Sequence, residues 1–296
     1  MSSEKLDLLS RHSLFIVEPT SQHTHTFIFL HDLGSNGEEF SHQLLETGTC
    51  SDGRKLPEVF QGARFIFPTA KSRRSSAYGQ AKLTQWFDIA SLDDPWHQSQ
   101  TQLMGLVEST REILKLVNEE VQVLKIPRSN IIIGGHGHGC AMALFCLLAL
   151  DFPLGAFIGM SGWLPFQPDI EQLLNYEDEI DKFTDYPFSF FRSTHDEEPR
   201  DPAIDVVEYS RDLVCFPNPI KDATSIATPI FLGHSDLDEK VKHSFGENAS
   251  TTLSSIGYNV TWKSYRNQGH WYKMPDEIDD IVDFMQHRVD KGSGNT

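Results

Sequence analysis

The sequence predicts an α/β fold, with a mostly parallel, doubly wound sheet and helices on both of its faces. Short, nearly continuous apolar segments alternate with longer segments of helical periodicity. Apolar strands of this kind are typical of parallel sheets covered on both sides, and their alternation with helices implies repeated crossover units. The chain has 296 residues. We expect one domain over 1–296, because α/β folds of this size commonly form a single unit.

The expected strands share β-branched or aromatic residues and turn signals at their ends. They are Leu14–Val17, Phe27–His31, Arg64–Phe67, Asn130–Gly134, Ala156–Met160, Pro229–Gly233 and Asn259–Ser264. Helical spacing of apolar residues marks the segment from Leu103 to Val121 and the segment from Ile278 to Val289. The latter begins with acidic residues after a proline, which suits a helix N-terminus.

One stretch breaks this alternation. Residues 167–227 are acidic, aromatic and punctuated by prolines, and they include Phe188, Phe190 and Phe191. A long irregular insertion in an α/β domain is often a lid or binding segment. A surface excursion with one or two helices is an equally good interpretation.

Composition excludes several classes of function. The net charge of −17 argues against nucleic acid and anionic membrane surfaces as partners. The N-terminus lacks the apolar core of a signal peptide, and the longest apolar run, Ala141 to Leu150, is too short to span a bilayer. The four cysteines lack zinc-site spacing. We therefore expect a cytoplasmic protein with reduced thiols and no stable membrane insertion, whose oligomeric state stays open.

A glycine-rich turn joins an apolar strand to an apolar helix in the middle of the chain. This is the setting of the G-x-S-x-G nucleophile elbow, where small flanking residues permit a strained turn. Aligned on its glycines, Gly135-His-Gly-His-Gly139 places Gly137 at the nucleophile position. A phosphate-binding loop is a weaker interpretation, since no Lys-Ser/Thr pair follows the glycines.

Two further segments contain an acid and a histidine in the order expected after such an elbow. The strand that begins at Pro229 ends in an acidic loop with Asp236 and Asp238, and His270 follows the next strand. Nucleophile position, acid, then histidine is the chain order of α/β-hydrolases. Each lies after a strand, at the sheet edge where ligands bind in open parallel sheets.

With these motifs, the chain resembles the acyl-protein thioesterase, or phospholipase/carboxylesterase, family of α/β-hydrolases, in the style of its fungal members. The matching segments run through nearly the whole chain: Phe29-Leu-His-Asp-Leu-Gly-Ser-Asn-Gly37, Phe65-Ile-Phe-Pro-Thr69, Gln85-Trp-Phe-Asp-Ile89, Gly134-Gly135, Gly139-Cys-Ala141, Ser161-Gly-Trp-Leu-Pro165, the Asp238 loop and His270. The resemblance implies the α/β-hydrolase fold.

The same resemblance implies roles for individual residues. Asp238 would be the triad acid and His270 the triad base, and the backbone N–H groups of Leu33 and His138 would form the oxyanion hole. The expected substrate pocket contains His31, Trp86 and His136. Asp236 competes for the acid role, but the matching family acid is the second aspartate of this loop.

Three departures from the family matter for the chemistry. The family has serine at the position of Gly137, usually glutamine at that of His138, and glycine at that of Asp32. Glycine has no oxygen to acylate, and loss of a triad serine costs about 10⁶ in rate. We expect the nucleophile position to be vacant, with extra room for a substrate or a water.

We expect no metal and no cofactor. His136 and His138 would suit zinc together with Cys140 or His31, but alternate side chains at an elbow need not converge. Cys140 lies a turn into the helix, where it is better interpreted as a packing residue. Lys71, Arg73 and Arg74 form a short basic loop.

Two classes of function follow. The first is an enzyme in which His270 and Asp238 carry out acid–base chemistry on a small carbonyl or ester substrate, by elimination, isomerisation, cyclisation or water activation. Histidine suits this role because its ordinary pKa lies near neutrality. The second is a non-catalytic pseudo-hydrolase that binds an acyl or ester ligand or a protein partner. A serine-knockout form of a carboxylesterase or thioesterase is a third interpretation. The retained acid and base favour an enzyme, whereas the missing nucleophile favours the pseudo-hydrolase.

Overall fold

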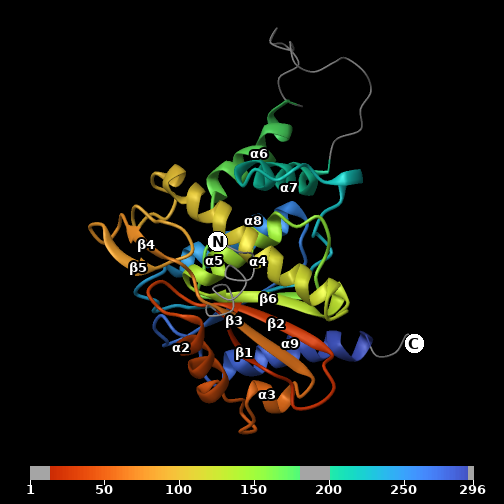
Figure 1. Ribbon diagram of the computed structural model, residues 1–296. Coiled ribbons are helices and arrows are strands. Elements are labelled where there is room, and N and C mark those ends of the chain that lie inside the picture. Colours follow the sequence, from red (N-terminus) through yellow and green to blue (C-terminus); the bar gives the residue numbers. More distant parts are fainter. Residues whose placement is uncertain (1–13, 181–200, 293–296) are drawn as a thin grey trace, which may run out of the picture.

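The computed structural model describes residues 14–180 and 201–292 and consists of a seven-stranded sheet flanked by helices (Figure 1). The strands lie in the order β1-β3-β2-β6-β7-β8-β9. Their bounds are β1 Leu14–Val17, β2 His25–Leu30, β3 Ala63–Pro68, β6 Ile131–His136, β7 Ala156–Met160, β8 Ile230–Ser235 and β9 Val260–Tyr265. All seven predicted strands are confirmed, two with the predicted ends and five with ends that shift by one or two residues.

Only the edge strand β1 runs antiparallel, against β3, and every other pair in this sheet is parallel. The carboxyl ends of the parallel strands therefore meet at one edge of the sheet, as the strand–helix alternation predicts. The loops after β2, β6, β8 and β9 leave from this edge, and they contain the candidate site.

Helices cover both faces of the sheet (Figure 1). They are α2 Gly37–His42, α3 Leu56–Val59, α4 Leu103–Gln122, α5 His138–Leu148, α6 Gln167–Ile180, α7 Pro202–Leu213, α8 His243–Ile256 and α9 Asp276–Gly292. One face packs against α4, α5 and α8, and the other against α2, α3 and α9. Side chains alternate between these two cores along each strand: Ile28 and Leu30 face the first, and Phe27 and Phe29 the second.

Helix α5 is buried along its whole length. Its apolar run therefore belongs to the core, as predicted. Among the described residues, no helix is long and apolar enough to cross a membrane.

The segment 167–227 contributes α6 and α7, which lie beside each other and over α5 and α8 (Figure 1). Helix α7 has a proline in its first turn, and the side chain of Asp201 caps it by accepting from the Ala203 N–H. Phe188, Phe190 and Phe191 lie outside the described residues. A lid function for this segment stays a prediction.

The predicted basic loop is instead a two-stranded antiparallel ribbon, β4 Ser72–Ser75 with β5 Ala81–Thr84. Arg73 forms an ion pair with Glu108 of α4 at 2.8 Å, and Lys71 pairs with Glu112 at 2.6 Å. Sequence patterns missed the ribbon because its strands are short, polar and largely exposed, so they lack apolar alternation.

Candidate active site

The turn between β6 and α5 has the backbone of a nucleophile elbow. Gly137 lies between them with φ 54° and ψ −118°, a left-handed region that L side chains rarely adopt. Its N–H donates to the Met160 carbonyl at 2.9 Å, and its carbonyl accepts from the Ala141 N–H at 3.2 Å. The sharp strand-to-helix turn is therefore present although the position has no side chain.

The space beside Gly137 is not vacant, which corrects the expectation of extra room. A Cβ on Gly137 would lie 2.2 Å from Asp32 Oδ1 and 2.6 Å from Asp32 Cγ. The carboxylate that follows β2 thus occupies the place into which a side chain at the elbow would project. Sequence alone could not show this, because Asp32 and Gly137 lie on different loops.

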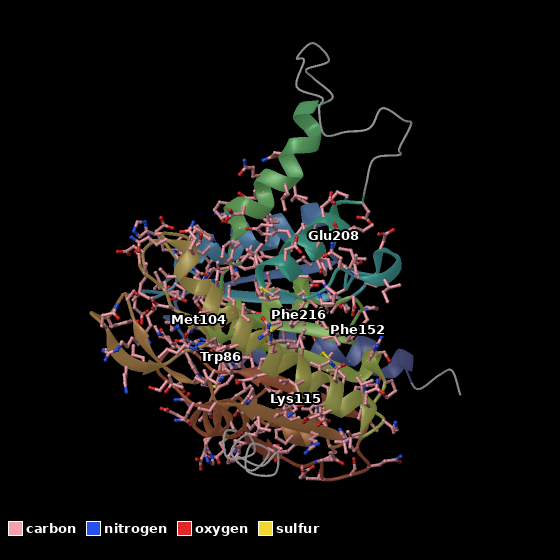
Figure 2. The ribbon with its side chains drawn as sticks, turned by 45° about the horizontal axis from the view of Figure 1, so that its top comes forward. Trp86, Met104, Lys115, Phe152, Glu208 and Phe216 are labelled. Atoms are coloured by element: carbon pink, nitrogen blue, oxygen red, sulfur yellow. The ribbon has the colours of Figure 1, made fainter. Side chains whose placement is uncertain are left out.

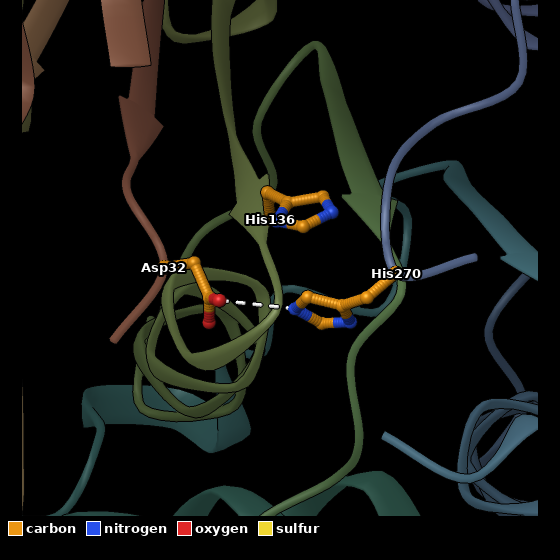
Figure 3. Close-up of side chains that lie close together, drawn as sticks. All are labelled: Asp32, His136 and His270. Atoms are coloured by element: carbon orange, nitrogen blue, oxygen red, sulfur yellow. Dashed lines mark hydrogen bonds and ion pairs between the residues drawn. The ribbon is translucent and has the colours of Figure 1, made fainter. Parts of the chain in front are cut away.

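Asp32 is bonded on both of its oxygens. Oδ1 accepts from the His138 N–H at 2.8 Å, and Oδ2 lies 3.0 Å from His270 Nε2 (Figure 3). His138 opens α5, so its N–H is one of the free donors at the positive end of the helix dipole. Although burial opposes charge on Asp32, the bond from His270 and the nearby imidazoles hold the pKa of this carboxyl well below its ordinary range. Asp32 is therefore a carboxylate at neutral pH.

His270 lies between two carboxylates. Its Nδ1 is 2.8 Å from Asp238 Oδ2, and its Nε2 faces Asp32. Burial alone would lower the pKa of His270, but the bonds from Asp238 and Asp32 outweigh it and raise the pKa to about 9. This corrects the expectation of a pKa near neutrality. His270 is an imidazolium at neutral pH, and each ring N–H donates to one carboxylate.

Asp238 is held by a network of its own. Its Oδ1 accepts from the N–H groups of Lys240 and Val241, both at 2.9 Å, and Oδ2 lies 3.2 Å from His234 Nε2. The side chain is shielded from solvent. Burial raises its pKa, but His234 and His270 more than offset this and hold the pKa far below the ordinary value.

The competing acid, Asp236, lies elsewhere. Its Oδ1 accepts from the Asn267 N–H at 2.9 Å, and the residue is exposed. Asp238, not Asp236, therefore contacts His270. Sequence reasoning missed His234, which contacts Asp238, and Glu239, whose carboxylate accepts the His270 backbone N–H at 3.1 Å. Both belong to the β8 segment already singled out, but neither has a motif of its own.

His136 and His138 flank Gly137 and point into different surroundings. The His136 ring lies 4.8 Å from that of His270 (Figure 3). The His138 ring packs edge-on against Phe87 and stacks on Trp163, with centroids at 4.2 and 5.8 Å. Burial lowers the pKa of each to about 3, so both rings are neutral. The two imidazoles do not converge, and Cys140 is buried on the helix, where burial raises the pKa of its thiol.

His31 and Trp86 lie in the interior, next to the site. His31 Nδ1 donates to the Asp32 carbonyl at 2.7 Å, and its Nε2 accepts from the Ala70 N–H at 3.0 Å. Trp86 donates its indole N–H to the His31 carbonyl at 2.8 Å. Trp86 is 1% exposed, whereas Met104 on the outer side of α4 is 73% exposed (Figure 2). These bonds fix the backbone at Asp32, and a substrate-pocket role for His31, Trp86 and His136 stays a prediction.

The loop after β2 is fixed by further contacts. The Gly34 N–H donates to the Thr84 carbonyl of β5 at 2.8 Å, and the Ser35 N–H donates to the Asp32 carbonyl at 3.2 Å. The role of the Leu33 N–H in an oxyanion hole stays a prediction. For His138, the corresponding N–H points at the site, where Asp32 Oδ1 accepts it.

The chain is similar to acyl-protein thioesterases in sequence and in fold. The chain is 26% identical over 286 residues to acyl-protein thioesterase 1 of Neurospora crassa, covering 96% of this chain and 94% of that protein. It is 27% identical over 274 residues to acyl-protein thioesterase 1 of Saccharomyces cerevisiae, covering 91% and 94%. The crystal structure of Zea mays acyl-protein thioesterase 2 superposes with a TM-score of 0.64 at 26% identity, over 93% of this chain and 98% of that one.

The fold is that of the α/β-hydrolases, as the resemblance implies. Arabidopsis thaliana SOBER1, at 19% identity and a TM-score of 0.62, shares the fold over 90% of this chain and 99% of its own. The model of the phospholipase/carboxylesterase family matches residues 11–181, which include β2, the Asp32 loop, the elbow and α5. With more than half of its length matched in this way, the chain belongs to the phospholipase/carboxylesterase family.

Proposed function

We propose that this protein acts on a small carbonyl or ester substrate by acid–base chemistry, without an acyl-serine intermediate. In this proposal His270 transfers the proton, Asp238 orients it, and Asp32 stands where the family's serine would. The observation that carries the proposal is the double bonding of the Asp32 carboxylate, to the His138 N–H and to His270 Nε2.

Positions 32 and 137 lie in two loops, after β2 and after β6, and we infer that a side chain was lost from one and gained in the other. The family pattern pairs glycine at the first with serine at the second, and this chain has Asp32 and Gly137. A side chain at 137 would collide with Asp32, so the two departures are sterically complementary. A serine-knockout form would need only the second of them. We therefore infer that the site was rebuilt around a carboxylate.

The geometry places an acid and a carboxylate side by side. The imidazolium of His270 would donate a proton to a carbonyl oxygen or a leaving group, and Asp32 would orient a water against the carbonyl carbon or attack that carbon itself. A substrate oxygen that displaces Asp32 Oδ1 from the His138 N–H would then have that donor available as negative charge develops. Acid–base catalysis by a positioned side chain contributes about 10² to 10⁴ in rate.

The class of substrate in this proposal follows the names of the relatives, which favour an acyl or similarly apolar group beside the reacting carbonyl. A small apolar pocket, whose lining includes Trp163, Val241, Phe245 and Lys240, lies near Asp238, which accepts the Val241 N–H. Asp32, Gly137, Asp238 and His270 are not part of this lining. We retain a cytoplasmic location as part of this proposal, since all four cysteines are free.

A second candidate is a non-catalytic ligand-binding protein. Asp32 already occupies the His138 N–H and one nitrogen of His270, so any ligand must compete with it. This occupancy is the observation that favours the pseudo-hydrolase.

The test uses a panel of short-chain aryl esters, thioesters and lactones with the wild-type protein and with His270→Ala. We expect turnover by the wild type, its loss in His270→Ala, and no covalent adduct with a fluorophosphonate. Single turnover in H₂¹⁸O reports whether Asp32 attacks the substrate itself, because a carboxylate nucleophile would pass its own ¹⁶O to the product.

The outcomes separate the candidates. A fluorophosphonate adduct on the wild-type protein would contradict the proposal by revealing an active serine. Ligand binding without turnover, unaffected by His270→Ala, would instead support the pseudo-hydrolase.

A further inference from the structure

Three metal-ligating side chains converge at the carboxyl edge of the sheet. Asp32, His136 and His270 come from the loop after β2, the end of β6 and the loop after β9. Each offers one ligand atom, and these atoms all lie within 4.8 Å of one another. Among residues 14–180 and 201–292, no other group of three or more His, Cys, Asp or Glu side chains has its ligand atoms this close together. Figure 3 shows the three side chains close together, with a dashed line between Asp32 and His270.

His136 has no role in the hydrogen-bond network that the other two share. It is 0% exposed, and neither ring nitrogen has a hydrogen-bond partner. Its ring is enclosed by His270 and Trp271, with centroids at 4.8 and 4.7 Å. Leaving a buried polar group unsatisfied costs about 1 to 3 kcal/mol. A bound metal ion would remove this cost by accepting the lone pair of one His136 ring nitrogen.

The neighbours of the other two side chains suit metal binding. Asp238 accepts from His270 Nδ1 at 2.8 Å, which aims Nε2 at Asp32 and His136. A carboxylate behind a ligating histidine is the usual outer partner in metal sites, where it fixes the tautomer and the ring orientation. The His138 N–H holds Asp32 Oδ1 and leaves Oδ2 directed at His270.

We propose that Asp32, His136 and His270 bind a divalent transition-metal ion of the Zn²⁺ type. Two imidazoles and one carboxylate suit such an ion, and three protein ligands leave a coordination position open. The set does not suit Mg²⁺ or Ca²⁺, which prefer oxygen ligands. The ion would take the place of the proton on His270 Nε2, since ligating nitrogens must be deprotonated.

The required movement is small. With metal–ligand bonds of about 2.0 to 2.2 Å in a tetrahedron, ligand atoms lie roughly 3.4 Å apart. The 3.0 Å separation between Asp32 Oδ2 and His270 Nε2 would widen slightly. The ligand atoms lie at most 4.8 Å apart, so the widest separation would close by at most about 1.4 Å. This inference does not rest on the proposed reaction, because it concerns binding alone. The metal-bound form is an alternative to the form in which His270 Nε2 carries the proton to be transferred.

The test is equilibrium dialysis of the full chain, first stripped with a chelator, against Zn²⁺ and separately against Co²⁺. We expect one equivalent of either ion and, for Co²⁺, the visible absorption of a low-coordinate nitrogen–oxygen site. His136→Gln should abolish stoichiometric binding, and Asp238→Asn should weaken it about 10- to 100-fold. The matched control is His138→Gln, which changes an equally buried histidine of the same turn whose ring points elsewhere, and which should bind as the wild type does.

Two results would overturn the proposal. One is a wild-type protein that binds no more Zn²⁺ than His136→Gln does, and the other is equal loss in His136→Gln and His138→Gln. Circular dichroism checks that each variant is folded. If His136→Gln does not fold, the Asp32→Asn variant is used instead, because the Asp32 side chain is 19% exposed. That variant should weaken Zn²⁺ binding at least 10-fold, and unchanged binding would contradict the site.

Discussion

In our proposal, the two halves of the candidate site depart from the family pattern to different degrees. In the half formed by Asp238 and His270, the acid and the histidine keep the contact expected of a hydrolase triad, at 2.8 Å, and backbone N–H groups still hold the acid. In the half formed by Asp32 and Gly137, the elbow backbone persists, but the polar group at the reacting position comes from a different loop.

His270 has a polar partner on Nε2, the Asp32 carboxylate, although Gly137 at the elbow has no side chain. A serine hydroxyl there would be neutral, whereas Asp32 is a carboxylate and raises the proton affinity of the imidazole between it and Asp238. The proposed exchange of side chains would therefore change the charge state of the site.

The largest expected effect is restored acyl chemistry in the double variant Asp32→Gly/Gly137→Ser. It removes the carboxylate that blocks the elbow and supplies a hydroxyl to His270. Hydrolysis of a short-chain aryl ester should rise by roughly 10³-fold or more over the wild type, since a triad serine accounts for about 10⁶ in rate. Stopped-flow or steady-state spectrophotometry measures this rate.

The two single variants are the controls. Gly137→Ser alone should gain no ester hydrolysis over the wild type because Asp32 occupies the space, and Asp32→Gly alone should gain none because it lacks a nucleophile. A folded double variant with no more esterase activity than either single variant would show that the retained half no longer supports acylation.

The second prediction tests the retained half within the active double variant. Adding Asp238→Asn should remove most of the gain and return ester hydrolysis toward the wild-type rate, because the imidazole loses its orienting acid and takes the wrong tautomer. Adding Asp236→Asn instead should change the rate little, since Asp236 bonds to the Asn267 N–H and not to His270. Similar losses in both variants would indicate a general disturbance of the loop.

The third prediction concerns Glu277 of α9, whose carboxyl group lies beside Gly233 of β8. Glu277 of α9 is fully buried, and burial raises its pKa to about 8. The folded protein keeps it protonated, whereas the unfolded chain ionises it near its ordinary pKa of 4.5. The stability that protonated Glu277 contributes is therefore fully present below about pH 4.5 and is lost as the pH rises toward 8.

Glu277→Gln should remove this loss, because Gln stays neutral and still offers an oxygen to the Lys273 N–H, which Glu277 Oε2 accepts at 2.9 Å. Urea unfolding at pH 5 and pH 9 should show a gain of a few kcal/mol at the higher pH relative to the wild type. Glu247→Gln, at an exposed position of α8, is the matched control and should show no such difference. A parallel pH dependence in the wild type and Glu277→Gln would refute the assignment.

The smallest expected effect measures the collision at the elbow itself. Gly137→Ser and Gly34→Ser both place a side chain at positive φ, 54° and 81°, but a Cβ on Gly34 would meet nothing within 4 Å. The difference in their unfolding free energies should therefore report the contact with Asp32. We expect Gly137→Ser to be the less stable by about 1 to 3 kcal/mol, the usual cost of overpacking. Equal losses in the two variants would mean that Asp32 moves away freely.

Much of the site could be predicted from local patterns. The apolar segments at Ile131 and Pro229 predict strands, and chain order after them places Gly137, Asp238 and His270 at one sheet edge. The β4–β5 ribbon, His234 and Glu239 were missed because their contributions come from contacts with residues distant in sequence or from edges without apolar periodicity.

The sequence by itself determined the α/β class, the strand–helix order, the glycine at the elbow and the acid–histidine pair, because each depends on local periodicity or on a short motif. Only the tertiary structure decided what fills the elbow. Asp32 and Gly137 are separated by more than a hundred positions in the chain, and parallel pairing of β2 with β6 brings their loops together. The same pairing leaves His136 buried without a hydrogen-bond partner, facing a histidine that arrives from beyond β9. Contacts of this kind depend on the distance and direction of side chains from separate strands, which no local pattern records.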